Sequence, residues 1–149
     1  MGLLDAGIYG VHLVFAALWA GSVVFVTVAV LPTATSGVAN AGPLASVTRR
    51  LTQVSRASAL LLLVTGGHLA ATRYPGTALL DTTRGNLVLA MVVLWFALGA
   101  LVELGTSKLT SGFAAQKVRT PATEARPFFR ASSLVAILLL LDAGAILGL

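Results

Sequence analysis

The 149-residue sequence contains no cysteine and very little charge. The absence of cysteine excludes disulfides, thiolate zinc sites, iron–sulfur clusters and the covalent attachment of a c-type haem. Only 10% of the residues are charged, whereas 57% are hydrophobic. A soluble domain of this length needs far more charge to cover its surface. The composition therefore predicts an integral membrane protein that is in contact with lipid.

Long apolar runs predict four transmembrane helices, at about residues 7–31, 53–72, 85–104 and 128–149. Each run is long enough to cross a hydrocarbon core of about 30 Å. No basic segment precedes the first run, which is also too long for the core of a signal peptide, so we expect it to remain as a helix. The sequence thus predicts an all-α, four-helix membrane bundle that forms one domain over residues 1–149.

The connections between the runs carry local signals of their own. Residues 33–48 are rich in small and polar side chains, which predicts a loop or a short interfacial turn, with the second helix beginning near Leu44. The cluster Asp81-Thr82-Thr83 is typical of the residues that cap the N-terminus of a helix, here the third span.

The net charge of +5 follows the expected topology. Eight of the ten basic residues lie in or beside the first and third connections: Arg49, Arg50, Arg56, Lys108, Lys117, Arg119, Arg126 and Arg130. The positive-inside rule places these connections in the cytoplasm and both termini outside. We therefore predict a multi-pass protein of the cytoplasmic (plasma) membrane of a prokaryote, and no role with nucleic acid.

Four side chains that can bind a metal or carry a proton lie at similar depth in the four predicted spans. At 1.5 Å per residue, His12 lies about 7 Å inside the outer end of its span and His68 about 6 Å inside. Met91 lies about 9 Å deep and Asp142 about 10 Å deep. Cofactor sites of four-helix bundles are built in this way from inward-facing side chains. Ionisable residues inside a membrane also indicate function.

The chemistry of this layer favours a metal or a haem. Two imidazoles suit axial ligation of haem b, or a copper site, and Met91 is a soft ligand for haem iron or Cu(I). A lone methionine also fills packing gaps, so Met91 has that simpler explanation. Asp142 is predicted to relay protons or to hydrogen-bond a ligating imidazole, unless it is only hydrated near the helix end.

Two arginines lie just outside the layer. Arg73 and Arg84 are placed where haem propionates would need charge-assisted partners. Anchoring of the helices at the membrane interface is the simpler role for both arginines.

Several short motifs resemble a known family. They are His12 with Trp19-Ala20-Gly21, Arg50, Ser55-Arg56, Thr65-Gly66 and Arg84-Gly85-Asn86-Leu87. Together they resemble the CopD-type copper resistance membrane family and, more distantly, the HemJ-type protoporphyrinogen oxidase. The resemblance implies a four-helix membrane unit whose His12 binds a metal or haem b. It also implies copper uptake for the first group, and haem b binding with protoporphyrinogen oxidation for the second.

One position departs from this pattern. Both groups tend to carry lysine six residues after the glycine that opens the third span, where this sequence has Met91. The substitution argues against the HemJ-type oxidase activity. His68 does not correspond to a position of either family.

Three functions remain open from the sequence, and no catalytic residue is predicted. The first is a haem b protein with His12 and His68 as axial ligands. It would act in electron transfer, haem handling or redox chemistry, with a redox partner at the outer face, and it could be a membrane oxidoreductase. The second is a CopD-type copper-binding protein or permease that uses His12, His68 and Met91. The third is an accessory structural subunit without a cofactor, which packs through small residues. A homo-oligomer is compatible with each.

Overall fold

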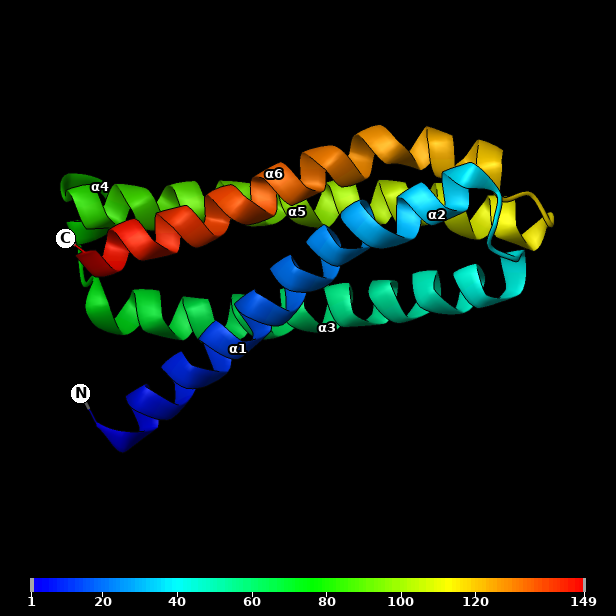
Figure 1. The fold of residues 1–149 in the computed structure, drawn as a ribbon. Coiled ribbons are helices and arrows are strands. Elements are labelled where there is room, and N and C mark those ends of the chain that lie inside the picture. The colour runs from blue at the N-terminus through cyan, green and yellow to red at the C-terminus, as the bar shows by residue number, and fades with distance from the viewer. Residues whose placement is uncertain (1, 149) are drawn as a thin grey trace.

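The computed structural model describes residues 2–148 as helices joined by short turns, with no strand in that range (Figure 1). The helical elements are α1 (Leu3–Phe25), a π-helical segment (Val26–Val30), α2 (Leu31–Ser36), α3 (Ala41–Arg73), α4 (Ala78–Asp81), α5 (Thr83–Ala114) and α6 (Arg119–Gly148). The first three form one continuous helical stretch. That stretch, α3, α5 and α6 are each long and apolar enough to cross a membrane. The prediction of an all-α, four-helix membrane bundle is confirmed.

The helices extend well beyond the apolar runs, and most of the segment expected to be a loop is helical. Residues 31–36 form α2, and α3 begins at Ala41, so only a short turn at 37–40 remains. The small polar residues of α2 do not break it because the hydroxyls of Thr33, Thr35 and Ser36 donate to carbonyls of their own helix. The helix ends at Gly37, whose φ of 75° is favourable only for glycine.

The start of α5 follows the cap that the sequence predicts. Thr82 adopts an extended backbone, and its hydroxyl oxygen accepts a hydrogen bond from the Gly85 N–H at 3.0 Å. Gly85 itself packs against the short helix α4, and a Cβ there would lie 2.3 Å from the carbonyl oxygen of Ala78. A side chain at position 85 would therefore push α4 away from α5.

We call the end of the bundle with the turns at 37–40 and 115–118 the inner end and the opposite end the outer end, after the predicted topology. The core clusters occupy only the inner and middle parts of the bundle. The inner cluster includes Leu44, Leu109, Phe113 and Phe129, and the middle cluster includes Trp19 and its neighbours on the other three helices. In α1 no residue before Trp19 is buried, and in α6 none of the described residues after Ala136 is buried. The outer third of the bundle therefore has no core cluster among the described residues, although Leu69 of α3 is buried there.

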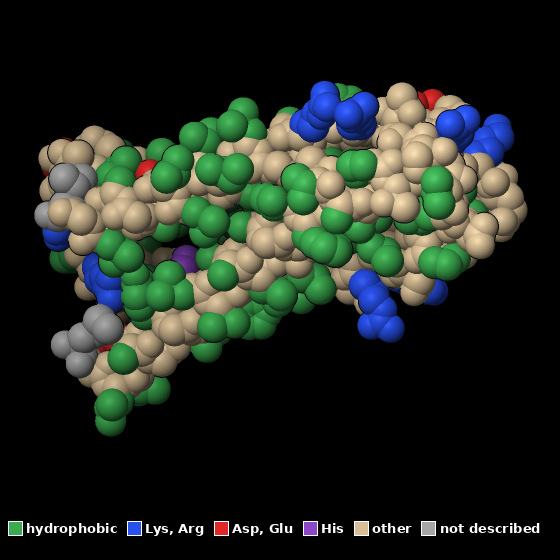
Figure 2. All heavy atoms as spheres, viewed as in Figure 1, with side chains coloured by type: hydrophobic (Ala, Val, Ile, Leu, Met, Phe, Trp, Pro, Cys, Tyr) green, Lys and Arg blue, Asp and Glu red, His purple; other side chains and the backbone are tan. Residues whose placement is uncertain are grey.

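This open outer end is visible in the arrangement of the helices. In Figure 1 the N-terminal half of α1 diverges from α6, while its other half lies against that helix. Figure 2 shows a hollow between that diverging half and the rest of the molecule, with a histidine side chain inside it. Both termini lie at this end (Figure 1). The assignment of this end to the outside of the cell stays a prediction.

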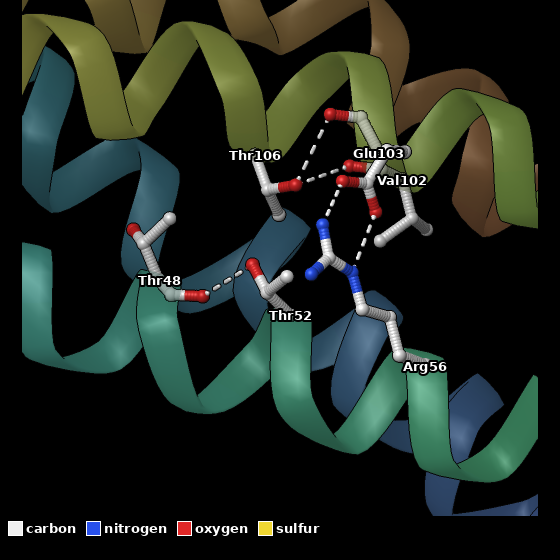
Figure 3. Close-up of polar contacts among 6 residues, drawn as sticks. All are labelled: Thr48, Thr52, Arg56, Val102, Glu103 and Thr106. Atoms are coloured by element: carbon white, nitrogen blue, oxygen red, sulfur yellow. Dashed lines mark hydrogen bonds and ion pairs between the residues drawn. The ribbon is translucent and has the colours of Figure 1, made fainter.

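An ion pair joins α3 to α5 nearer the inner end (Figure 3). Arg56 Nε donates to Glu103 Oε2 at 3.3 Å, and a second guanidinium nitrogen pairs with Oε1. The neighbouring threonines in Figure 3 donate to carbonyls of their own helices instead. Since both charged side chains are more than half exposed, the pair contributes little to stability in a solvated setting. The pair shows which positions of α3 and α5 lie side by side.

Close packing of α5 on α6 generates a test of the fold. A Cβ at Gly105 would lie 2.8 Å from the buried ring of Phe129, whereas one at Gly99, on the same helix, would meet nothing within 4 Å. We expect Gly105→Ala to lower the free energy of unfolding by about 1–3 kcal/mol through overpacking. Gly99→Ala, the matched control, should leave it unchanged or raise it because alanine favours a helix.

The measurement is thermal unfolding of both variants in mild detergent. Equal unfolding temperatures for Gly105→Ala and Gly99→Ala would contradict the described contact between α5 and α6.

Candidate functional site

His12 is held against α3 by a hydrogen bond that fixes its tautomer. The His12 Nδ1 and Thr65 Oγ1 atoms lie 2.8 Å apart, and the same hydroxyl lies 2.6 Å from the carbonyl oxygen of Leu61. A hydroxyl has one hydrogen, and it is donated to the carbonyl. The imidazole must therefore donate its own hydrogen from Nδ1 to Thr65. The neutral ring then keeps a lone pair on Nε2, which is the form that binds a metal.

A glycine makes room for this ring. A Cβ at Gly66 would lie 3.0 Å from His12 Cε1, which is closer than almost any real Cβ contact. Gly66 follows Thr65 directly, so one dipeptide provides both the hydrogen-bond partner of the imidazole and the space that it occupies. The motif Thr65-Gly66 thus has a local physical role at His12.

The His12 contact belongs to a row of polar pairs between α1 and α3, which we call the polar seam. Its pairs, from the middle of the bundle outward, are Trp19 with Ser55, His12 with Thr65 and Asp5 with His68. The Trp19 indole N–H donates to Ser55 Oγ at 2.7 Å in a buried setting. The His68 Nε2 and Asp5 Oδ1 atoms lie 3.5 Å apart, and both side chains are more than 40% exposed. The seam holds α1 on α3 where α1 diverges from the other helices.

The structure gives the two histidines different surroundings. His12 is half-buried and bonded to a hydroxyl, whereas His68 is exposed and paired with the carboxylate of Asp5. Asp5 had no role in the sequence analysis. The signal that points to it is spacing, because Asp5, His12 and Trp19 recur every seven residues and so share one face of α1.

The other predicted site residues lie around the same outer end. Met91 on α5 and Asp142 on α6 are half-buried, and Arg73 and Arg84 are exposed at the outer ends of α3 and α5. The Arg73 guanidinium carbon lies 5.2 Å from the centre of the Tyr9 ring, which adds a cation–π contact between α3 and α1. Within residues 2–148, no group of three or more His, Cys, Asp or Glu side chains is placed to hold a metal ion. The described residues therefore form no preassembled closed site of the structural-zinc type.

An open groove leads to the His12 partner. It has a volume of about 470 Å³ and is lined by Leu3, Leu4, Gly7, Ile8, Val11 and Thr65. These residues belong to the outer half of α1 and to α3. A small ligand in this groove can therefore contact Thr65, the hydrogen-bond partner of His12, without displacing a packed core.

The tautomer of His12 can be tested directly. We expect ¹⁵N NMR of histidine-labelled protein to show His12 with its hydrogen on Nδ1. Thr65→Val should shift His12 toward a mixture of tautomers because the acceptor for that hydrogen is lost. Thr72→Val, on the same helix, is the matched control, since the Thr72 hydroxyl bonds only to backbone carbonyls. A His12 spectrum that is identical in wild type and Thr65→Val would contradict the assignment.

The comparisons with known proteins identify the family. The sequence model of the family described as copper resistance protein D (CopD) matches residues 45–147, which cover more than half of the chain. Neither the search of curated proteins nor the search of solved structures gave a significant match. No comparison supports the distant HemJ-type resemblance or haem b, and the family description agrees better with the copper interpretation. On the strength of the match over α3, α5 and most of α6, the chain belongs to the copper resistance protein D (CopD) family.

Proposed function

We propose that the protein binds copper, as Cu(I), at the open outer end of the bundle, and that His12 Nε2 is the anchoring ligand. The observation that carries the proposal is the hydrogen bond from His12 Nδ1 to Thr65, which leaves Nε2 as a lone-pair donor. Family membership supplies the choice of metal. Imidazole suits copper, and an imidazole whose other nitrogen is already bonded is oriented for ligation.

Two further side chains at this end can complete the ligand set. Met91 provides a thioether on α5, and soft sulfur ligands select Cu(I) over harder cations. His68 provides a second imidazole on α3, one turn outward from Thr65. Its side chain is exposed and pairs with Asp5. Counted from the Arg56–Glu103 pair, His68 and Met91 both lie about 18 Å outward, about one turn further out than Thr65. We propose that His68 and Met91 receive the ion at the entrance and that His12 holds it deeper in the hollow.

The distribution of the core supports uptake of the ion from the outer side. The inner half of the bundle is closed by large side chains, among them Leu31, Leu109, Phe113 and Phe129, which are nearly inaccessible. The outer end is open through the groove that reaches Thr65. With the predicted orientation, the described state can receive copper from outside a prokaryotic cytoplasmic membrane. Movement of copper into the cell would require the inner cluster to separate.

We expect purified wild-type protein in mild detergent to bind Cu(I) in competition with a colorimetric Cu(I) chelator under anaerobic conditions. His12→Ala should abolish binding because it removes the anchoring nitrogen. His68→Ala should weaken binding less, since His68 is exposed and bonded elsewhere. Thr65→Val should weaken binding by about 10–100-fold, which is typical when the hydrogen-bond partner of a metal-ligating histidine is removed.

Two results would contradict the proposal. The first is Cu(I) affinity that is unchanged in His12→Ala. The second is a haem absorption spectrum, with sharp bands on reduction, that is lost in both His12→Ala and His68→Ala. That spectrum would instead establish the bis-histidine haem b interpretation of the sequence.

A further inference from the structure

Two buried polar atoms in the outer half of the bundle have no hydrogen-bond partner among the described residues. They are Trp95 Nε1 on α5 and Asp142 Oδ2 on α6. One is a hydrogen-bond donor and the other an acceptor. Buried groups of this kind are normally satisfied, so each unsatisfied one indicates a water, an ion or a ligand that completes it. Such a pair within a membrane helix bundle needs a specific explanation.

The contacts between the helices place these two atoms at nearly the same height, which we measure along the helix axes from the inner end toward the outer end. The Arg56–Glu103 ion pair marks positions of α3 and α5 that lie side by side, and Trp95 lies about 12 Å outward from Glu103. Thr65 lies about 13 Å outward from Arg56, which is level with Trp95.

The packing of α6 on α5 completes this comparison. The contact of Gly105 with the Phe129 ring sets the register of the two helices, and from it Asp142 lies about 4 Å further outward than Trp95. Trp95, Asp142 and the partner of His12 thus lie within one helical turn of each other in height.

The two residues also lie on helix faces that meet the middle core cluster. Trp95 and Leu139 both pack against the middle core cluster, and Asp142 lies one turn after Leu139 on the same face of α6. Long side chains on a helix lean toward its N-terminus. That direction is outward for α5 and inward for α6, so Trp95 and Asp142 lean toward each other.

Asp142 differs from the other acidic residues of the chain. Asp5 pairs with His68 and Glu103 pairs with Arg56. Asp81 and Glu124 are exposed near helix ends. Asp142 alone lies inside an apolar span with a carboxylate oxygen that is shielded and unbonded within the described range. An acid in such a position costs about 2.5–3.5 kcal/mol on insertion scales, so its presence indicates a function.

We infer that Asp142 supplies the negative charge that neutralises a monovalent copper ion in the outer half of the bundle. The inference rests on the proposed function. Imidazole and thioether ligands are neutral, so a Cu⁺ ion that they hold keeps its full charge. A buried charge without an opposite charge is strongly unfavourable. A water molecule that accepts from Trp95 Nε1 and donates to Asp142 Oδ2 fits the unsatisfied donor and acceptor and holds the carboxylate in place.

The test compares Asp142→Asn, which keeps the shape and removes the charge, with Asp142→Glu, which keeps the charge. Glu124→Gln is the matched control because it removes an exposed acid from the other end of the same helix. In the Cu(I) competition assay we expect Asp142→Asn to bind about 10–100-fold more weakly than wild type. Asp142→Glu should retain most of the affinity, and Glu124→Gln all of it.

Thermal unfolding of the copper-free variants separates a copper role from a structural one. In the copper-free protein no cation neutralises the shielded carboxylate, so Asp142→Asn should unfold at the same temperature as wild type or a higher one. Copper affinity in Asp142→Asn equal to wild type would overturn the inference and leave the proposed function intact. A copper-free Asp142→Asn protein that unfolds at a clearly lower temperature would overturn it too, because the residue would then be structural. Absence of Cu(I) binding by wild type would be failure of the proposed function itself.

Discussion

The hydrogen bond between His12 Nδ1 and Thr65 Oγ1 is the contact on which the outer half of the bundle depends. The first half of α1 has no buried residue of its own, so packing of apolar side chains does not hold it in place. Polar contacts with α3 do so instead, and the His12 contact is the central pair of the seam. The same bond sets the tautomer of the imidazole. One interaction therefore positions the helix and prepares the ligand.

The difference between the closed inner half and the open outer half follows from where the chain places bulky and small residues. At the inner end, glycines at 105 and 112 let α5 approach the rings of Phe129 and Pro121 closely. At the outer end, a Cβ at Gly7, Gly10 or Gly144 would meet nothing within 4 Å. Both of these close approaches between α5 and α6 lie where an inward passage would have to open. An outer end with few packed contacts is also where local motion costs least.

The sequence predicts the number of spans and the cap at Thr82 because apolar run length and capping chemistry are local properties. It does not predict the helix at 31–36, since threonine and serine hydroxyls can serve a turn or bond back to a helix equally well. The pairs Asp5–His68 and Arg56–Glu103 join residues far apart in the chain, and nothing local specifies them. For the site, the sequence groups His12, His68, Met91 and Asp142 only by their estimated depth in the predicted membrane spans. The hydrogen-bond partners of the two histidines, Thr65 and Asp5, follow only from the packing of α1 on α3. The sequence therefore leaves open whether the two histidines bind one haem or one copper ion.

The buried hydroxyl of Ser58 lies at the boundary between the polar seam and the middle core cluster, on one face of α3. Ser58 lies on the same stripe of α3 as Ser55 and Thr65, and it is fully buried, yet its oxygen has no partner within the described residues. Ser55 is satisfied by Trp19 and Thr65 by His12, because both of those residues lie on the face of α1 that meets α3. Ser58 falls between these two contacts, where the neighbouring side chains are apolar members of the middle cluster. The stripe of hydroxyl and leucine residues on α3 thus binds an imidazole at its outer end. At the boundary with the core it leaves the Ser58 hydroxyl unsatisfied within the described residues. The unfavourable energy of that group is offset by burial of the apolar side chains of the middle cluster around it.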